Sequence, residues 1–543
     1  MPTLPPGPAA ALPPLELPPA EAVTRAFPLP SFRAGQREAL VSAARALAAG
    51  RNVQLEAPVG SGKSPMAIAL ARWAKGGLIT TPLNSLVDQY ERDFGARSDV
   101  AVIKGREHYA CDRTGGTAAS APCLYDRQAR KSCQCPFARA KAKALERPVV
   151  ITSMAMAMAA PWMPSLPLVI VDEAHNLEGS VARQVALEFR EEDFALPAPK
   201  ASFEDHLAWL QEALTRARAN AEAFDDQIDG LVEAGAEKDG SVWVPHDLLK
   251  QRDHWRSQVT KIAEMLLDRK VSGEAWVAQE KRSAGGARRV VYQPVTGTRF
   301  VRSKLLARGR LAVLLTATPP TTHEVGLGEQ VERIVMPWTW PKERRPVVLD
   351  YRGSMSLQRR AQNMGRIAQG IRDHANGKTI VHAHAHSLAR ALSDELKRLG
   401  VAHVLQDPDD REGSLAKWMR GLEEVFVSVR MNEGLDLRDD LCRTQILAKM
   451  PWPDLGDPWV QARNSTMGDA WMHREVARSI AQAYGRAVRS EQDWANFVIL
   501  DEGFEAFYRR DKAMFPTWFR EAVGLPKAAA TGSVKEPASA RGA

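Results

Sequence analysis

Residues 57–64 read Ala-Pro-Val-Gly-Ser-Gly-Lys-Ser and directly follow a short apolar stretch. Gly60 and Gly62 leave room for backbone N–H groups to surround a phosphate. Lys63 can reach the β and γ oxygens of a nucleoside triphosphate, and the Ser64 hydroxyl can bind Mg²⁺. The stretch therefore predicts a strand, a phosphate-binding loop and a helix that begins near Lys63.

A second stretch, residues 168–175, reads Leu-Val-Ile-Val-Asp-Glu-Ala-His. Its apolar run is typical of a buried strand, and the strand ends in two carboxylates. Asp172 can hold the metal ion and Glu173 can polarise the attacking water. Because both stretches follow strands, we interpret them as the two halves of one ATP hydrolysis site. A glycine-rich turn beside a solvated acidic patch would not explain their shared context.

The intervening and following sequence alternates between strand and helix patterns, which is typical of a parallel α/β sheet. The expected helices cover 36–49, 63–74 and 83–94, and the expected strands cover 77–81, 148–152, 168–171 and 311–316. A second α/β unit begins near Arg345. Its expected strands cover 378–382, 425–429 and 444–448, with a helix over 387–399. The predicted fold class is α/β, with two parallel-sheet units.

The composition is that of a globular protein of several domains. The chain has 543 residues, of which 45% are hydrophobic and 25% charged. We find no apolar run of 18 or more residues and no secretory leader pattern, so we expect no membrane segment and a cytoplasmic location. The net charge of +8 is compatible with a polyanionic partner but does not by itself identify one.

Four of the five cysteines fall within one short segment. They are Cys111, Cys123, Cys133 and Cys135. Such a cluster in an intracellular chain indicates a metal centre and not a disulfide framework. Both [4Fe–4S] and Zn²⁺ use four thiolates, but zinc sites usually have two closely spaced pairs, so the uneven spacing favours iron–sulfur. His108 would be a ligand in the zinc alternative. Cys442 is isolated and is expected in the core.

Residues 482–489 read Gln-Ala-Tyr-Gly-Arg-Ala-Val-Arg. If they form a helix, Arg486 and Arg489 share one face. Two planar cations of this kind can stabilise the charge that develops on the γ-phosphate during hydrolysis. The alternative is a solvated helix face. Residues 316–318, Thr-Ala-Thr, form a small hydroxyl-bearing loop after a strand, which suits a link between hydrolysis and domain movement.

Taken in order, these motifs resemble the XPD/DinG-like iron–sulfur helicases of superfamily 2, over about Phe32 to Phe504. The resemblance implies two RecA-like motor domains, with an Fe–S domain and a helical arch inserted in the first. The implied division is a Pro-rich tail at 1–30, motor domain 1 at 31–103, 147–179 and 300–340, an Fe–S cluster domain at 104–146, an arch at 180–299, motor domain 2 at 341–525 and a tail at 526–543.

The resemblance also implies roles for individual residues. Catalysis would fall to Lys63, Asp172, Glu173, Gln482, Arg486 and Arg489. The nucleotide-binding residues would be Gln36, Gly60, Gly62, Lys63, Ser64, His175, Gly434 and Asp436. Ser64 and Asp172 would bind Mg²⁺. The [4Fe–4S] cluster would be bound by Cys111, Cys123, Cys133 and Cys135. The sequence departs from the family at Asn432, where an aromatic residue is usual, and at 382–386, which lacks the usual Ser-Tyr pair.

The implied activity is an ATP-driven motor that moves 5′→3′ on single-stranded DNA and parts duplex junctions at the cluster domain. No exonuclease domain is expected before the motor. One alternative is an accessory translocase or remodeller that a protein partner complex recruits, for example in a phage, plasmid or CRISPR-associated system. The Pro-rich N-terminal segment would then be a docking element. A preference for RNA over DNA leaves no signature in the sequence.

Overall fold

The computed structural model describes residues 15–124, 127–199, 201–238, 244–273, 275–282, 286–429, 439–488 and 492–527. The chain divides into two compact units. The first comprises the described residues up to Ala57, Gly62–Met336 and Asp454–Gly468, and the second comprises Pro58–Ser61, Pro337–Pro453 and the described residues from Asp469 onward. Among these described residues, no helix is both long enough and apolar enough to cross a lipid bilayer.

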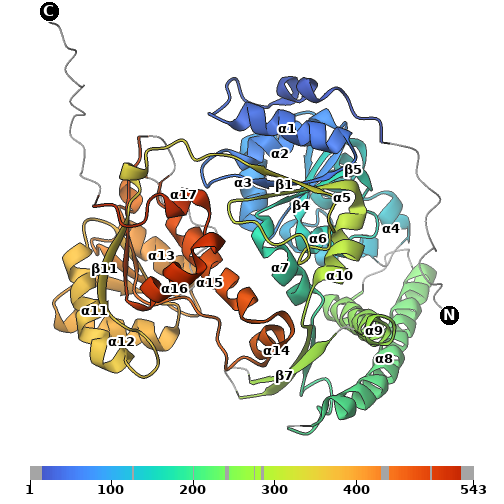
Figure 1. Cartoon of the computed structure of the whole chain (residues 1–543). Helices are drawn as coiled ribbons and strands as arrows, with labels where there is room; N and C mark the ends of the chain where they lie inside the picture. Colours follow the sequence, from blue (N-terminus) through green and yellow to red (C-terminus); the bar gives the residue numbers. More distant parts are fainter. Residues whose placement is uncertain are drawn as a thin grey trace, which may run out of the picture. The chain divides into compact units, whose positions relative to one another are not determined.

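The first unit is built on a seven-stranded sheet in which all neighbouring strands are parallel (Figure 1). In spatial order the strands are β10 (Val331–Val335), β1 (Asn52–Glu56), β9 (Gly309–Thr316), β5 (Leu166–Asp172), β2 (Gly77–Thr81), β4 (Val149–Ser153) and β3 (Val100–Val102). The predicted α/β fold class is confirmed. Each strand and helix named in the sequence analysis for this unit lies within two residues of its expected bounds.

Apolar side chains are buried on both faces of this sheet. Successive side chains of a strand point to opposite faces, so one strand contributes to two cores. Leu168 and Ile170 of β5 pack into an apolar core under the first three helices, whereas Val169 and Val171 pack into a core on the opposite face. The helices of the first face are α1 (Gln36–Ala48), α2 (Lys63–Trp73) and α3 (Asn84–Phe94). The opposite face carries α5 (Pro136–Glu146), α6 (Met154–Ala159) and α7 (Leu177–Gln184).

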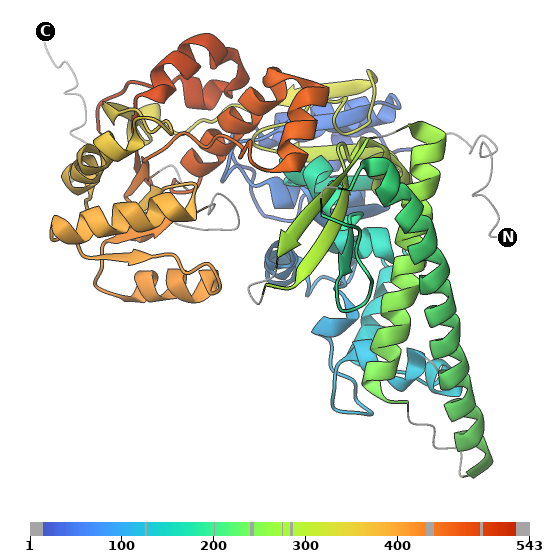
Figure 2. The same cartoon turned by 90° about the horizontal axis from the view of Figure 1, so that it is seen from below.

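The insertion after β5 is a long helical hairpin joined to a small sheet. Helices α8 (Phe203–Lys238) and α9 (His246–Ser272) run side by side, as Figure 2 shows. The sequence analysis expected only a helical arch here. The structure adds a three-stranded antiparallel sheet in the order β6 (Leu187–Arg190), β8 (Arg288–Pro294) and β7 (Trp276–Arg282). This sheet was missed because its strands flank a long stretch of helical periodicity.

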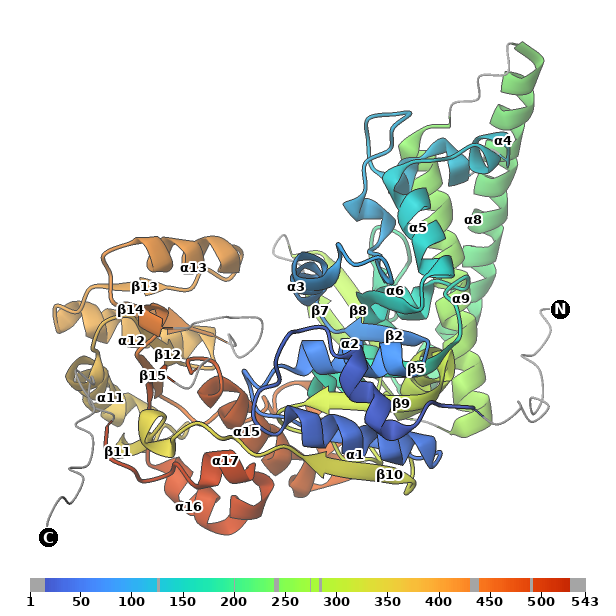
Figure 3. The ribbon, with the colours of Figure 1, turned by 90° about the horizontal axis from the view of Figure 1, so that it is seen from above.

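The cysteine segment lies between β3 and β4 and is mostly irregular. Its longer elements are α4 (Arg127–Lys131) and α5 (Figure 3). The turn Ala118–Ser120 contacts α9 directly. The segment packs against the rest of the first unit through the contact of Phe137 with Trp162. Within the segment, the guanidinium of Arg106 lies 4.2 Å from the Phe137 ring centroid.

The second unit contains a six-stranded sheet, again with all pairs parallel. Its strands in spatial order are β11 (Val347–Gly353), β16 (Asn496–Asp501), β15 (Thr444–Leu447), β12 (Thr379–His382), β14 (Val425–Ser428) and β13 (His403–Leu405). Helices α11 (Arg360–His374) and α12 (His386–Arg398) cover one face, and Trp418 of α13 (Arg411–Arg420) packs on the other. The remaining helices are α15 (Asp469–Tyr484), α16 (Gly503–Asp511) and α17 (Thr517–Arg520).

Two features differ from what the sequence led us to expect. The supposed N-terminal tail contains a 3₁₀ helix, Ala20–Ala26, in which Val23 is fully buried against α1 and α2. Helix α15 ends at Tyr484, so Arg486 lies beyond the helix and cannot share a helix face with Arg489. Gly485 follows the last helical residue and favours this termination, because glycine has low helix propensity. Residues Gly434, Asp436 and Arg489 lie outside the described residues.

A segment that the sequence analysis assigned to motor domain 2 packs with the first unit. It contains α14 (Pro458–Met467). Arg463 of α14 forms a bidentate ion pair with Glu178 of α7, and the two side chains are only 4% and 7% exposed. The same carboxylate accepts a hydrogen bond from the backbone N–H of Gly297, and Arg463 also donates to the Val295 carbonyl. One buried carboxylate therefore joins three segments that are far apart in the sequence.

We predict that Glu178→Ala strongly destabilises the first unit. Removing one partner of a buried ion pair leaves the other charge without compensation, which typically costs about 3–5 kcal/mol. The measurement is the thermal unfolding temperature of the full chain. The control is Glu332→Ala, which breaks an exposed pair with Arg51 in the same unit. Equal unfolding temperatures for the two variants would contradict the prediction.

Candidate nucleotide site and cysteine cluster

The predicted hydrolysis residues lie together because three neighbouring strands end at one edge of the first sheet. In the order β1, β9, β5, the strands pair in register with Glu56 opposite Thr316 and Asp172 opposite Leu315. The carboxyl ends of parallel strands are where α/β proteins bind their ligands. The phosphate-binding loop follows β1, the Thr-Ala-Thr segment follows β9 and the two carboxylates follow β5.

The loop after β1 has the backbone conformation that its glycines allow. Gly60 and Gly62 have φ angles of +77° and +83°, and such positive angles suit glycine alone without strain. Helix α2 begins at Lys63 directly after the loop, so its free N–H groups can bind a phosphate. Pro65 lies in the first turn of α2, where its missing N–H costs nothing.

Gln36 holds the loop from the start of α1. Its side chain is 1% exposed, accepts a hydrogen bond from the Arg33 N–H at 2.7 Å and donates to the Gly62 carbonyl at 3.3 Å. A Cβ atom placed on Gly62 would lie 2.3 Å from Gln36 Nε2. A residue expected to bind the nucleotide therefore also packs directly against the phosphate-binding loop at Gly62.

Lys63 faces the carboxylates. Lys63 Nζ lies 3.6 Å from Glu173 Oε1, and both side chains are mostly buried. Glu173 has a φ of +53°, which is unusual for a residue other than glycine and is often found at functional sites. This conformation turns the chain at the end of β5 so that Asp172 and Glu173 stand next to each other at the sheet edge.

Asp172 is buried, and the pKa of its carboxyl group is raised above the usual value. Burial, and next the neighbouring charge of Glu173, raise the pKa of Asp172 to about 6, against the opposing effect of Lys63. Tyr90 of α3 donates a hydrogen bond to Asp172 Oδ2 at 2.8 Å. Two adjacent carboxylates with one ammonium group form a site that an added divalent cation would neutralise further. Sequence reasoning missed Tyr90, because it lies on a helix and follows no recognisable motif.

His175 links the ends of β5 and β9. Its Nδ1 lies 3.2 Å from Thr316 Oγ1 and 3.4 Å from Glu173 Oε2. Thr316 Oγ1 in turn accepts a hydrogen bond from the Thr318 N–H at 3.2 Å. Glu173 is thereby connected through His175 to Thr316, the first residue of the Thr-Ala-Thr segment.

The four cysteines surround one cavity. Its volume is about 150 Å³, and its lining includes the thiols of all four. Cys133 and Cys135 Sγ lie 3.4 Å apart, and Arg106 Nη1 lies 4.0 Å from Cys123 Sγ. Burial raises the pKa of the Cys111 thiol, but hydrogen bonds from Thr114 and from nearby backbone N–H groups outweigh it and the net shift is downward.

No three His, Cys, Asp or Glu side chains within the described part of the chain converge closely enough to hold a single metal ion. For the nucleotide site this is consistent with Mg²⁺ chemistry, because Mg²⁺ usually takes one or two protein ligands and completes its shell with phosphate and water. For the cysteines it means that the thiols line a space and do not meet at one point.

Of the residues expected in the second unit, Gln482 lies on α15 and Arg486 just after it, and they are 3% and 7% exposed. In β12, burial lowers the pKa of His382 to about 4, while a hydrogen bond with Gln445 opposes that shift. His382 is thus a neutral core residue of β12.

Comparison with known proteins identifies two helicase domains in this order. Residues 34–197 match the DEAD/DEAH box helicase family, and residues 369–522 match the helicase C-terminal domain family. The mouse ATP-dependent DNA helicase DDX11 is 30% identical over 112 residues, which are 18% of this chain and 12% of that protein. A regulator of telomere elongation helicase 1 homolog from Aedes aegypti is 28% identical over 116 residues, 19% of this chain and 11% of that protein. The matches thus cover only about an eighth of these relatives.

Solved structures show the same fold over nearly the whole chain. The structure of Xpd4 from S. tokodaii covers 91% of this chain and is covered completely, with a TM-score of 0.54 and 16% identity. A structure of an XPD helicase covers 90% of this chain and is itself covered to 99%, with a TM-score of 0.60 and 14% identity. The chain thus contains a DEAD/DEAH box helicase domain followed by a helicase C-terminal domain, and its fold is similar to that of the XPD helicases.

Proposed function

We propose that this protein is an ATP-dependent DNA helicase that moves 5′→3′ along single-stranded DNA and separates duplex at its cysteine domain. The observation that carries the proposal is the arrangement of Lys63, Asp172 and Glu173 at the ends of β1 and β5, with His175 in contact with Thr316 at the end of β9 between them. Hydrolysis at this edge would be communicated through Thr316 to the rest of the chain. The relatives named as DNA helicases support DNA as the substrate.

In the proposed hydrolysis step, Gly60 and Gly62 let the loop surround the phosphates while Lys63 contacts the β and γ oxygens. Ser64 and Asp172 would hold the Mg²⁺ that accompanies ATP. Glu173 would orient and polarise the attacking water. Gln36 would bind the adenine, and His175 would sense the γ-phosphate side of the site through its contact with Glu173.

We further propose that the second unit supplies Gln482, Arg486 and Arg489 to the transition state, with Gly434 and Asp436 on the nucleotide. This assignment rests on the family resemblance. Arginine suits this role because its planar guanidinium can contact two phosphoryl oxygens at once.

We also propose that the cysteine cavity holds a [4Fe–4S] cluster and not a zinc ion, and this choice rests on the uneven spacing of the four cysteines in the sequence. All four cysteines line one space of about 150 Å³. Cys111, Cys123, Cys133 and Cys135 would bind the irons, and the cluster would fix a segment that has little apolar core of its own. Arg106 lies beside Cys123 and brings a positive charge to the cavity.

The competing proposal is a remodeller that a protein partner recruits and for which strand separation is incidental. Displacement of a labelled strand from substrates with 5′ or 3′ single-stranded overhangs distinguishes the two. The helicase proposal requires ATP-dependent displacement with the 5′ overhang only. DNA-stimulated ATPase without displacement would favour the remodeller, and activity on the 3′ overhang would overturn the polarity.

We predict that Lys63→Ala abolishes ATP turnover but leaves single-stranded DNA binding largely intact. Glu173→Gln should keep ATP bound and slow hydrolysis by about 10²- to 10⁴-fold, since an amide cannot accept a proton. Steady-state ATPase and nucleotide-binding assays check both. Glu332→Gln, on the edge strand of the same sheet, is the matched control and should turn over ATP normally. Normal turnover by Glu173→Gln would remove this residue from the mechanism.

We predict that Gly62→Ala weakens ATP binding by at least about tenfold, equivalent to about 1.4 kcal/mol. The new methyl group would displace Gln36, which contacts both Arg33 and the loop. Gly50→Ala is the control, because Gly50 has a similar φ of +74° but nothing within 4 Å of its Cβ position. Isothermal titration with a non-hydrolysable ATP analogue measures the difference, and equal affinities would show that Gln36 does not position the loop.

We predict that anaerobically purified protein is brown and contains about four irons per chain. Cys133→Ser should remove the colour and most of the iron, and should stop unwinding while part of the ATPase remains. Cys442→Ser is the control, since this thiol is fully buried in the second unit and should not affect iron content. Stoichiometric zinc without iron would reject the iron–sulfur assignment.

A further inference from the structure

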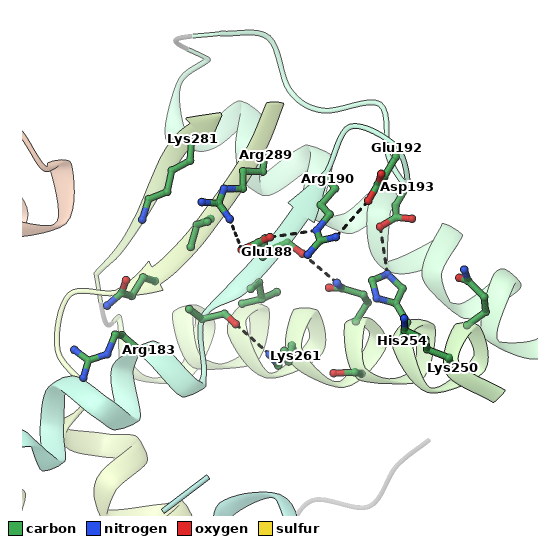
Figure 4. A pocket seen from close by; sticks show the side chains of 17 residues that line it. Arg183, Glu188, Arg190, Glu192, Asp193, Lys250, His254, Lys261, Lys281 and Arg289 are labelled. Carbon is green, nitrogen blue, oxygen red and sulfur yellow. Dashed lines mark hydrogen bonds and ion pairs between the residues drawn. The ribbon is translucent and has the colours of Figure 1, made fainter. Parts of the chain in front are cut away.

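A cavity lies inside the insertion, away from the nucleotide site. Its volume is about 980 Å³, and it lies between α9 and the sheet of β6, β8 and β7 (Figure 4). Its lining comprises Arg183, Ala186, Leu187, Glu188, Arg190, Glu192, Asp193, Lys250, Gln251, His254, Ser257, Gln258, Lys261, Lys281, Arg289, Val291 and Gln293. All of these residues belong to the first unit.

The walls of this cavity are polar where helix and sheet normally meet through apolar side chains. On α9, Lys250, His254 and Lys261 lie on a stripe with helical spacing, while Trp255 and Ile262 belong to the apolar core. On β8, Arg289 faces the cavity and the alternate residues Val290 and Tyr292 face the core. Two polar faces held apart across this volume form a binding site for a polar ligand.

The charge of the lining favours an anion. Six lysine or arginine side chains line the cavity against three carboxylates. The carboxylates are already paired: Glu188 with Arg190 and Arg289, Glu192 with Arg190, and Asp193 with His254. Among the described ion pairs, Arg183, Lys250 and Lys281 have none, and all three side chains are exposed to the cavity or solvent. The uncompensated charge of the cavity is therefore positive.

The positions of these cations indicate an extended ligand. Figure 4 shows Arg183 and Lys281 toward one end of the cavity and Lys250 at the other, with Lys261 between them. A single small anion would contact only one of these ends. A chain of phosphates could contact both.

A buried amide in the lining favours a ligand that also carries a hydrogen-bond donor. Gln258 lines the cavity, is 8% exposed and donates from Nε2 to the Glu188 carbonyl at 3.1 Å. Its Oε1 accepts no hydrogen bond from any described residue. Leaving a buried acceptor unsatisfied is costly, so a ligand that brings an N–H or O–H donor would be favoured. Nucleotide units carry both phosphates and such donors.

We propose that this cavity binds a stretch of single-stranded nucleic acid, with phosphates on Arg183, Lys281 and Lys250 and a base or sugar donor on Gln258. The proposal rests on the proposed function, because that function supplies the single strand. It assigns the insertion a strand-binding role of its own, separate from the hydrolysis site.

The affinity test uses fluorescence anisotropy of a labelled oligothymidylate on the full chain without nucleotide. Lys250→Glu/Lys281→Glu reverses two cavity charges. Arg218→Glu/Lys270→Glu reverses two exposed charges on α8 and α9 outside the cavity lining and is the matched control. The cavity variant should bind at least about tenfold more weakly and lose about 1.4 from the slope of log affinity against log salt, which is about 0.7 per phosphate contact. The control should change affinity by less than about twofold.

The location test uses wild-type protein and an oligonucleotide that contains 4-thiothymidine, so it does not depend on any variant folding. Cross-linked peptides should come from α9 and from β7 or β8. Equal binding by both variants together with cross-links only elsewhere would overturn the cavity proposal and leave the helicase proposal standing. If wild-type protein binds no oligonucleotide, the helicase proposal fails as well. If ATP or pyrophosphate abolishes the cavity cross-link without weakening oligonucleotide binding, the cavity takes free nucleotides and the strand proposal is wrong.

Discussion

The parallel pairing of β1, β9 and β5 is the constraint on which the nucleotide site depends. Backbone hydrogen bonds fix the register of these strands, so their carboxyl ends stop at the same level. The loop with Lys63, the Thr316 hydroxyl and the Asp172–Glu173 pair are then neighbours without any long-range fitting. Each further feature of the site refines this placement. Gln36 supports the loop from α1, and Tyr90 supports Asp172 from α3.

The two long elaborations of the first unit depend on this sheet in different ways. The cysteine segment leaves it between β3 and β4. Its second half, with Phe137 and Ala144, packs into the core on one face of the sheet, and Cys111, Ala121 and Cys123 form a small separate cluster. The insertion after β5 extends the same core of the sheet, with Phe189 and Tyr292 fully buried.

Local patterning explains which parts of the fold were predictable. The central strands of both sheets, such as β5, β9 and β12, are short buried runs and were predicted from the sequence. The strands β3, β10, β11, β13 and β16 were not predicted, and β10 and β11 lack a continuous buried run. The sheet of β6, β8 and β7 was not foreseen, because strand pairing across α8 and α9 depends on contacts about 100 residues apart. Tyr90 was missed for a similar reason. Its role is visible only once α3 is placed against β5.

The site in the second unit was predictable only as a set of motifs. Gln482 is on α15 as expected, but the assumption that the helix continued through Arg486 ignored Gly485. Likewise, counting prolines made residues 20–26 appear to be tail, although Val23 contributes an apolar side chain to the core under α1. In both cases a single residue, Gly485 or Val23, is associated with a local structure that the composition of the surrounding sequence did not indicate.

The way the insertion is attached has a consequence for how such proteins can be rebuilt. The chain enters through β6 and returns through β8, and these are adjacent antiparallel strands with Leu187 opposite Tyr292. Just outside them, Glu178 and Arg463 clamp the returning backbone at Val295 and Gly297. The two points where the insertion leaves and rejoins the first unit thus lie on neighbouring strands. The part of the insertion beyond these strands could therefore be replaced by the corresponding part of a relative without altering the spacing of the residues at the nucleotide site.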